Sequence, residues 1–174
     1  MSVEISIRPF READGPELYE SVRESMAALS QWMPWCHPDY SLSEAQEWIG
    51  KQIVAFESRD EFHFAIVSGD DRILGACGLN GIHRENRLAN LGYWVRTSQS
   101  QRGIASQAAR LLADWAFQNT ELNRLEILVA IQNLASLRVA AKIGGVWEGE
   151  LRGRLQIRDA MHDAVMFSII RSDR

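Results

Sequence analysis

The sequence has few cysteines and histidines and lacks long hydrophobic runs. Only two of its 174 residues are cysteines, Cys36 and Cys77, and they form no Cys-x-x-Cys or Cys/His ligand set. This scarcity argues against a disulfide-rich secreted scaffold and predicts a reduced, cytoplasmic protein without a metal site. No apolar run is long enough to span a membrane, and residues 1–5 lack the basic and apolar regions of a signal peptide. We therefore expect no membrane partner.

An excess of positive charge is also missing. The 19 Lys and Arg residues are outnumbered by 23 Asp and Glu residues, for a net charge of −4 at pH 7. This balance disfavours a general nucleic-acid-binding protein. Hydrophobic residues make up 46 % of the chain and charged residues 24 %, as in ordinary globular proteins. Internal repeats, low-complexity tracts and linkers are absent, so we expect one domain over residues 1–174.

The one candidate phosphate-binding segment contains fewer glycines than the known nucleotide-binding loops do. The segment over residues 98–108, here called the anion cradle, joins an apolar strand at 91–95 to a long helix and contains one glycine, Gly103. It therefore matches neither the Gly-x-x-x-x-Gly-Lys loop nor the three-glycine dinucleotide fingerprint. Unpaired N–H groups and positive potential at the start of the helix nevertheless suit a phosphate or pyrophosphate. The alternative is a glycine that only the turn requires.

Apolar periodicity predicts the order of helices and strands around this segment. Before the cradle, the predicted elements are a strand with Val3, Ile5 and Ile7, a helix over 14–29, an irregular proline-broken segment over 32–38, a helix with a capping box at 43–46, and a hairpin over 62–79. After it, the elements are the cradle helix to about residue 119, a strand over 125–130, a helix capped by Asn133 and ended by Gly144-Gly145, and a hairpin over 146–170 that turns near 158–159.

Connection rules convert this order into a fold class. Strands on either side of the cradle helix must run parallel, joined by a right-handed crossover, whereas the hairpins are antiparallel. We therefore expect an α/β (α+β) fold: a mixed, mostly antiparallel central sheet with one parallel pair at the ligand site and helices on both faces. Ligands tend to bind at the carboxyl ends of the central strands of such sheets, and the anion cradle follows one of these ends.

Six short segments are distinctive in their order along the chain. They are residues 7–14 (IRPFREAD), 32–35 (WMPW), 91–95 (LGYWV), 133–136 (NLAS), 142–149 (KIGGVWEG) and 162–167 (HDAVMF). Together with the cradle residues 101–105 (QRGIA), they resemble the GNAT family of acyl-CoA N-acyltransferases over nearly the whole chain. The branch that acetylates N-termini of ribosomal proteins, the RimL/RimJ type, is the most similar. The cradle departs from the family pattern Gln/Arg-x-x-Gly-x-Gly/Ala, because Ser100 replaces the first residue and Gln101 a usual glycine.

The resemblance implies an enzyme that moves an acetyl group from acetyl-CoA directly to a primary amine, with a ribosomal-protein N-terminus as the expected acceptor and no metal. The pyrophosphate would lie on backbone amides of the cradle, the pantetheine arm along the preceding strand, and the thioester near the helix that follows Asn133. The implied cofactor-binding residues are Tyr93, Trp94, Val95, Gln101, Arg102, Gly103, Ile104, Ala105, Ser106, Asn133 and Ser136.

The resemblance assigns one catalytic role and leaves another open. Ser136 would protonate the departing CoA thiolate; without the resemblance it is an ordinary serine in the first turn of a helix, and Asn133 an ordinary N-cap. No carboxylate is marked as the base that takes the proton of the amine, because Asn90 stands where many relatives carry a glutamate. His83 is the candidate base, with a surface residue or a water chain as alternatives.

The acceptor site is the least defined part of the prediction. Trp32 and Trp35, in the proline-broken segment, either wall the acceptor pocket or pack between helices, while His37 and His63 have no predicted role. Three functions stay open: a protein N-terminal acetyltransferase, an acetyltransferase for a small amine such as a polyamine, amino acid or antibiotic, and a non-catalytic acyl-CoA-binding module. The oligomeric state is open too, with a homodimer as one candidate.

Overall fold

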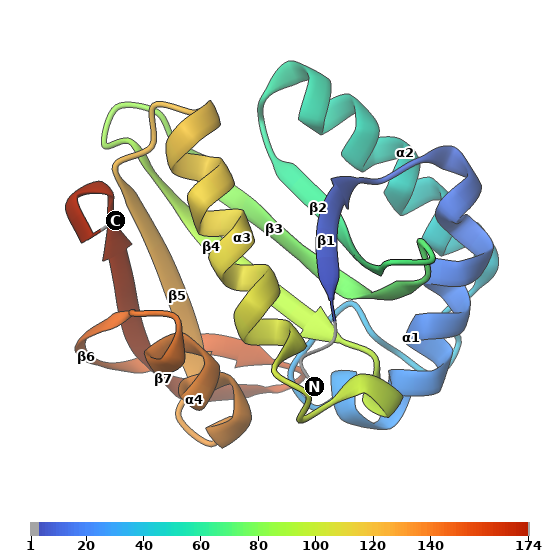
Figure 1. Cartoon of the computed structure of the whole chain (residues 1–174). Helices are drawn as coiled ribbons and strands as arrows, with labels where there is room; N and C mark the ends of the chain where they lie inside the picture. The colour runs from blue at the N-terminus through green and yellow to red at the C-terminus, as the bar shows by residue number, and fades with distance from the viewer. Residues whose placement is uncertain (1–3, 174) are drawn as a thin grey trace.

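The computed structural model describes residues 4–173, whose strands form one seven-stranded sheet in the order β1-β2-β3-β4-β5-β7-β6 (Figure 1). The strands are β1 (Ile5–Pro9), β2 (Phe62–Ser68), β3 (Ile73–His83), β4 (Leu88–Val95), β5 (Arg124–Ala130), β6 (Val146–Ile157) and β7 (Ala160–Ile170). The helices are α1 (Gly15–Leu29), α2 (Leu42–Ser58), α3 (Ile104–Asn119) and α4 (Leu134–Lys142). Short 3-10 helices lie at Glu12–Asp14, Thr97–Gln99 and Arg171–Asp173.

The sheet contains the predicted parallel pair. Within the described residues, β4 and β5 are parallel, and every other neighbouring pair is antiparallel. The parallel pairing matches Leu88 with Arg124 and ends where Asn90 meets Glu126. From there β5 continues beside β7, with which it pairs from Arg124 to Ala130. The ribbons of β4 and β5 therefore separate toward the start of α3 (Figure 1). The predicted fold class is confirmed.

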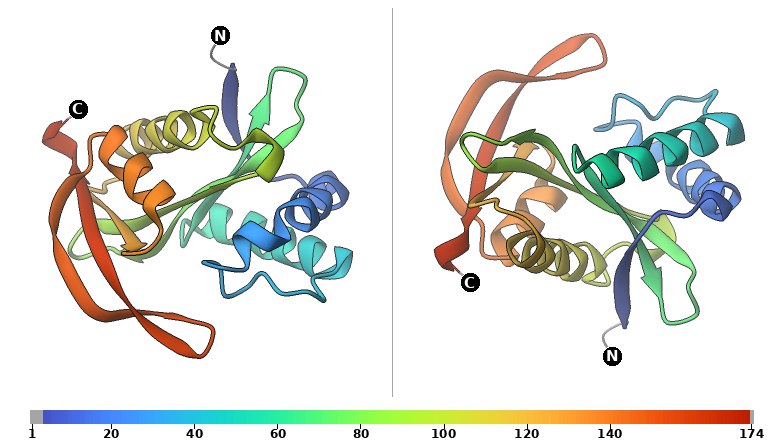
Figure 2. Two further views of the ribbon diagram at one scale, coloured as in Figure 1. Left: turned by 90° about the horizontal axis from the view of Figure 1, so that it is seen from below. Right: turned by 90° about the horizontal axis from the view of Figure 1, so that it is seen from above.

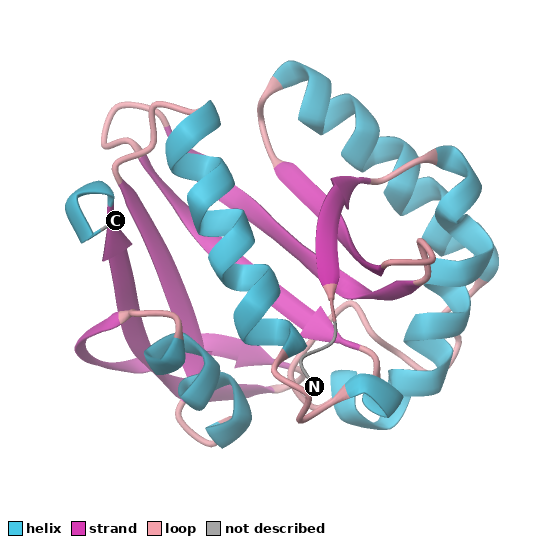
Figure 3. Cartoon of the chain, in the orientation of Figure 1, coloured by secondary structure: helices cyan, strands magenta, loops and turns pink. Residues whose placement is uncertain are grey.

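Helices cover both faces of the sheet. One face carries α3 and α4, and the other carries α1 and α2 (Figures 2 and 3). Because successive strand residues point to opposite faces, β2 contributes to both cores. Phe62 and Phe64 pack with α3 residues such as Leu112, whereas Ala65 and Val67 pack beneath α1 and α2. The sheet is thus buried on both sides.

The capping box of α2 is not the predicted one. Ser41, not Ser43, is the N-cap: its Oγ accepts a hydrogen bond from the Glu44 N–H at 3.3 Å, and Glu44 Oε2 accepts from the Ser41 N–H at 2.9 Å. Ser43 instead donates to Glu47 Oε1 at 3.1 Å, from within the helix. Both serines precede a Glu or Gln by three residues, so the sequence pattern fitted either. The preceding chain direction selects Ser41, whose backbone is extended.

Most other predicted boundaries are confirmed. The cradle helix ends at Asn119, and the final hairpin joins Val146–Ile157 to Ala160–Ile170. Strand β4 begins at Leu88 rather than residue 91, because the hairpin with β3 extends further than its apolar part. Val3, included in the predicted first strand, lies outside the described residues. Among residues 4–173, none of the helices has the length and apolar character that crossing a bilayer requires.

Candidate active site

The anion cradle enters α3 through two left-handed backbone positions. Gln101 has a φ of 61°, and Gly103, the N-cap, has a φ of 79°. No side chain within the described residues caps α3, so the N–H groups of Ile104, Ala105 and Ser106 have no partner inside the helix. A Cβ built on Gly103 would meet no atom within 4 Å. The cradle therefore presents open main-chain donors with the positive end of a helix dipole behind them.

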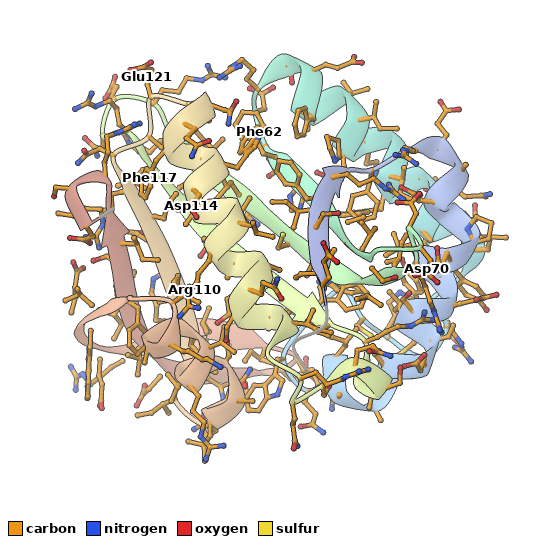
Figure 4. All side chains as sticks on the ribbon, in the orientation of Figure 1. Phe62, Asp70, Arg110, Asp114, Phe117 and Glu121 are labelled. Atoms are coloured by element: carbon orange, nitrogen blue, oxygen red, sulfur yellow. The ribbon has the colours of Figure 1, made fainter. Side chains whose placement is uncertain are left out.

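Several side chains of the cradle are buried or hydrogen-bonded to one another. Ile104 and Ser106 are buried, and the Arg102 guanidinium donates to Gln99 Oε1 at 2.6 Å. Further along α3, Arg110 donates to the Lys142 carbonyl and so ties α3 to the end of α4 (Figure 4). The cradle residues predicted to bind a cofactor thus share one place, and the groups they offer there are backbone amides.

The second predicted segment, Tyr93, Trp94 and Val95, lies on the divergent part of β4. On one side these residues pair with β3, where Tyr93 faces Cys77 and Val95 faces Gly75. On the other side the pairing with β5 has already ended at Asn90. Alternate N–H and C=O groups of a strand point to either neighbour, so this edge of β4 has backbone groups available to an extended ligand. The free edge leads from the cradle into the sheet.

Ser136 and Asn133 meet Tyr93 at the start of α4. The Oδ1 of Asn133 accepts a hydrogen bond from the Ser136 N–H at 3.1 Å, as an N-cap does. The Tyr93 hydroxyl lies 3.1 Å from both the Oγ and the carbonyl oxygen of Ser136. Burial raises the pKa of Tyr93 to about 12, which keeps this hydroxyl protonated at neutral pH. The sequence indicated Tyr93 only as a backbone partner, and its contact with Ser136 is a new finding.

A cavity of about 480 Å³ lies on the other face of the sheet, under α1 and α2. We call it the α1/α2 cavity. Its ionisable lining includes Glu44, Glu47, Glu61, Lys51 and His63. Three carboxylates against one ammonium group give it an acidic character. Its floor is made by strands β2 to β4 and reaches the free edge of β4, because residues 92–94 also line it.

The structure separates the two tryptophans predicted to wall an acceptor pocket. Trp35 lines the α1/α2 cavity, with its ring centroid 6.3 Å from that of Trp94 and 6.1 Å from that of Tyr40. Trp32 is half-buried and lies outside the lining of that cavity. The proline-broken segment therefore supplies Met33 and Trp35, but not Trp32, to the lining of the cavity.

The histidines are placed differently from the sequence prediction. His83 is exposed at the end of β3, where its Nδ1 accepts a hydrogen bond from the Asn86 N–H at 3.2 Å, and it does not line the α1/α2 cavity. His63, to which the sequence assigned no role, does line it. Asn90 donates to Asn80 Oδ1 at 3.0 Å, and Asn80 lines the cavity. The structure thus brings His63 to the α1/α2 cavity, whereas His83 pairs with Leu88 at the start of β4, outside the cavity lining.

The fold has two features that together are typical of acyl-CoA-binding N-acyltransferases: a sheet that opens between two parallel strands, and unpaired helix amides at the opening. The family described as "Acetyltransferase (GNAT) domain" matches residues 4–146. The chain belongs to this family, as the resemblance in its sequence indicated. It is an N-acetyltransferase that takes its acetyl group from acetyl-CoA.

Relatives cover almost the whole chain. A Bacillus subtilis protein named as an N-acetyltransferase, YjcK, is 31 % identical over 97 % of this chain and 95 % of its own length. The ribosomal-protein-serine acetyltransferase of Escherichia coli is 26 % identical over 88 % of this chain and 85 % of its own. The solved structure of RimL, a ribosomal alpha-N-protein acetyltransferase in complex with coenzyme A, is similar in fold, with a TM-score of 0.90 at 24 % identity over 97 % of this chain and 95 % of that one.

The residues present suit acetyl-CoA. Its pyrophosphate needs hydrogen-bond donors and positive potential, which the uncapped first turn of α3 supplies. Its pantetheine arm is an extended chain with amide groups, which the free edge of β4 can pair. Within residues 4–173, no group of three or more His, Cys, Asp or Glu side chains is arranged to hold a metal ion.

Proposed function

We propose that this N-acetyltransferase acts on the N-terminal amine of a protein or peptide, of the ribosomal-protein type. The observation that carries the proposal is the continuity of the free edge of β4 with the acidic α1/α2 cavity, through residues 92–94. A cavity of about 480 Å³ can take an amino group together with the first side chain of a peptide. The substrates named for the E. coli relative and for RimL support the same acceptor class.

We infer that the donor lies between the cradle and α4. The pyrophosphate binds the amides of residues 101–106, and the pantetheine arm pairs with the backbone of Tyr93, Trp94 and Val95. Asn133 keeps Ser136 at the start of α4, where Ser136 faces the Tyr93 hydroxyl. When bound there, acetyl-CoA supplies the activated acyl carbon, and β4 amides that point to the free edge can stabilise negative charge on its carbonyl oxygen.

Ser136 delivers the proton to the leaving thiolate. Its Oγ is 3.1 Å from the Tyr93 hydroxyl, which can accept or donate toward it. As the C–S bond breaks, the Ser136 O–H proton passes to sulfur, and Tyr93 supplies a hydrogen bond to the Oγ that is left. The helix dipole at the start of α4 favours negative charge at the same place. Tyr93 is thus a positioning residue for Ser136.

A small polyamine is the second candidate acceptor, and the acidic lining favours it specifically. Glu44, Glu47 and Glu61 around one cavity would attract a second ammonium group as readily as a first. A peptide with an acidic or neutral second residue would gain nothing from the extra carboxylates. The charge of the preferred acceptor therefore separates the two candidates.

A panel assay decides between them. Peptides that begin with Ser, Ala or Met are compared with spermidine and free amino acids, and CoA thiol release is followed together with the mass of the product. The matched control is each peptide with its N-terminus already acetylated, which leaves any lysine side chain free. We expect turnover of the free peptides and none of the blocked ones; turnover of small amines alone would overturn the proposed acceptor.

We also propose the broader setting of this activity. The single sheet that runs from β1 to β6 supports one acyl-CoA N-acyltransferase domain over the chain. Cys36 and Cys77 are buried in different cores and form no disulfide with each other, which supports a cytoplasmic location. A homodimer is tested by light scattering, which would report twice the mass of the chain.

A further inference from the structure

The strand register places His63 in a row with two glycines. His63 pairs with Gly78 across β2 and β3, and Gly78 pairs with Gly92 across β3 and β4. Residues directly opposite one another in antiparallel strands point to the same face, and all three line the α1/α2 cavity. With strands about 4.8 Å apart, the row spans about 10 Å from His63 to the free edge of β4. The row contains one side chain, the imidazole of His63, and two glycines that have none.

The space above Gly78 is occupied, whereas the space above Gly92 is open. A Cβ built on Gly78 would lie 2.3 Å from His63 Nδ1, so the imidazole ring occupies the space over Gly78. A Cβ built on Gly92 would meet no atom within 4 Å. The ring therefore reaches one strand toward β4 and stops, and the space over Gly92 is open. A small group held over Gly92 would lie between His63 and the edge of β4.

Two neighbours orient the His63 ring. Nε2 lies 3.1 Å from Glu61 Oε2, and the ring meets that of Trp48 edge-on, with centroids 5.4 Å apart at 77°. Because a carboxylate only accepts hydrogen bonds, Nε2 carries the proton and Nδ1 presents its lone pair over Gly78. A basic nitrogen over Gly78, one strand from Gly92, lies within reach of a group over Gly92 through a single water, as proton removal requires.

The charge of His63 fits this role. Burial lowers the pKa of His63 below its ordinary value, and the Glu61 carboxylate partly opposes that effect. The ring is therefore neutral at pH 7. The other titratable or charged groups around the cavity are Tyr40, Glu44, Glu47 and Lys51 from the α1–α2 side, Cys77 from β3 and Tyr93 from β4.

We propose that His63, held by Glu61, is the general base for the acceptor amine. This inference rests on the proposed function, since it concerns the amine that receives the acetyl group. With the amine over Gly92, one strand spacing of about 4.8 Å from Gly78, its nitrogen forms the new C–N bond to the acetyl carbon. Its proton moves through one water to His63 Nδ1, while the C–S bond breaks and Ser136 protonates the sulfur. His63 and Ser136 act from opposite faces of β4.

The test compares the wild-type chain with His63→Gln, using a peptide acceptor. We expect kcat to fall about 100-fold, within the range typical of general-base loss, with the Kd for acetyl-CoA changed less than twofold. In the wild type, kcat at saturating peptide falls as pH drops through the pKa of His63, and this acidic limb disappears in the variant. Imidazole added to His63→Gly restores part of the rate. The matched control, His162→Gln on β7, keeps both rate and limb.

A second pair of variants guards against misfolding. Glu61→Gln removes the charge that raises the pKa of His63, so the acidic limb moves to lower pH, which a purely structural role for Glu61 would not cause. Gly78→Ala pushes the ring off the row, so kcat falls while acetyl-CoA still raises the melting temperature. If His63→Gln does not fold, these two variants decide the question.

The outcomes separate the two proposals. A wild-type chain that acetylates peptides, with the rate and acidic limb intact in His63→Gln, overturns the base but leaves the proposed function standing. A limb that disappears in His83→Gln instead of His63→Gln does the same. A wild-type chain that acetylates only small amines overturns the acceptor class, and the same variants assayed with those amines still test His63.

Discussion

The anion cradle and the α1/α2 cavity, which we propose as the donor and acceptor sites, are built in opposite ways. The cradle offers backbone amides, while Ile104 and Ser106 are buried and Arg102 binds Gln99. The cavity offers side chains from the helices α1 and α2, their connecting loop and three strands, over positions that glycines leave empty. The first site depends on local chain conformation, and the second depends on how distant elements pack. Changes at the two sites should therefore alter different kinetic constants.

Ser136→Ala is the variant with the largest expected effect, and it changes a residue that contacts Tyr93 of the cavity lining. Loss of the hydroxyl that faces Tyr93 should lower kcat about 100- to 1000-fold, as loss of a general acid does. The Kd for acetyl-CoA should change less than twofold, because Asn133 still caps the Ser136 N–H. Steady-state rates and calorimetric titration check the two values. An equal loss of both would make Ser136 a binding residue.

Gly103→Val should change donor binding alone. At a φ of 79° a β-branched residue is strained, and its methyl groups would enter the open space beside the helix amides. We expect the Kd for acetyl-CoA to rise about 10- to 100-fold, while kcat at saturating donor stays near the wild-type value. Gly153→Val is the matched control: Gly153 also has a positive φ, 56°, but lies on β6. If both variants weakened donor binding equally, the effect would be one of stability.

Gly92→Ala should change acceptor binding alone. The new methyl group meets no atom within 4 Å, so the melting temperature should hold. It enters the space over Gly92, and we expect the KM for the peptide to rise about fivefold with donor affinity unchanged. Gly50→Ala on α2, where the added methyl is also unopposed, is the control and should only stabilise the helix, by up to about 1 kcal/mol. An unchanged KM in Gly92→Ala would place the acceptor elsewhere.

Gln101→Gly should have the smallest effect, on the cradle alone. Gln101 adopts a left-handed φ of 61°, which costs an L-residue about 1–2 kcal/mol. Glycine removes that strain but loses more chain entropy on folding, about 0.5–1 kcal/mol. The difference is a net gain of about 0–1.5 kcal/mol in the free energy of unfolding, which unfolding in urea measures. A loss of stability would mean that the Gln101 side chain contributes a contact of its own.

The cradle and the order of elements could be predicted because their signals are local. Apolar periodicity marks α3 from its first residue to Asn119, and Asn133 precedes a helix that it does cap. The capping box of α2 was misplaced by two residues, since Ser41 and Ser43 both satisfy the same spacing. The spacing pattern alone cannot choose between these two serines, because the direction of the chain that enters the helix decides which one is the N-cap.

The catalytic side chains of the cavity could not be predicted in the same way. The alternation of Phe62 and Phe64 already indicates that His63 points to the opposite face of its strand. Nothing in the sequence shows that Gly78 and Gly92 stand beside it, because that depends on two strand registers. His83 was the candidate general base because it lies at the end of a predicted strand. In the structure the β3–β4 hairpin extends to this point and leaves His83 exposed.

By itself, the sequence determined the class of fold, the loop and helix that form the anion cradle, and the helix that carries Ser136, since each follows from periodicity, turns and caps within about 15 residues of chain. Only the tertiary structure decided which histidine and which tryptophan line the α1/α2 cavity, and that Tyr93 touches Ser136. Those facts depend on strand register and on the divergence of β4 from β5, which are properties of packed elements and not of any one segment.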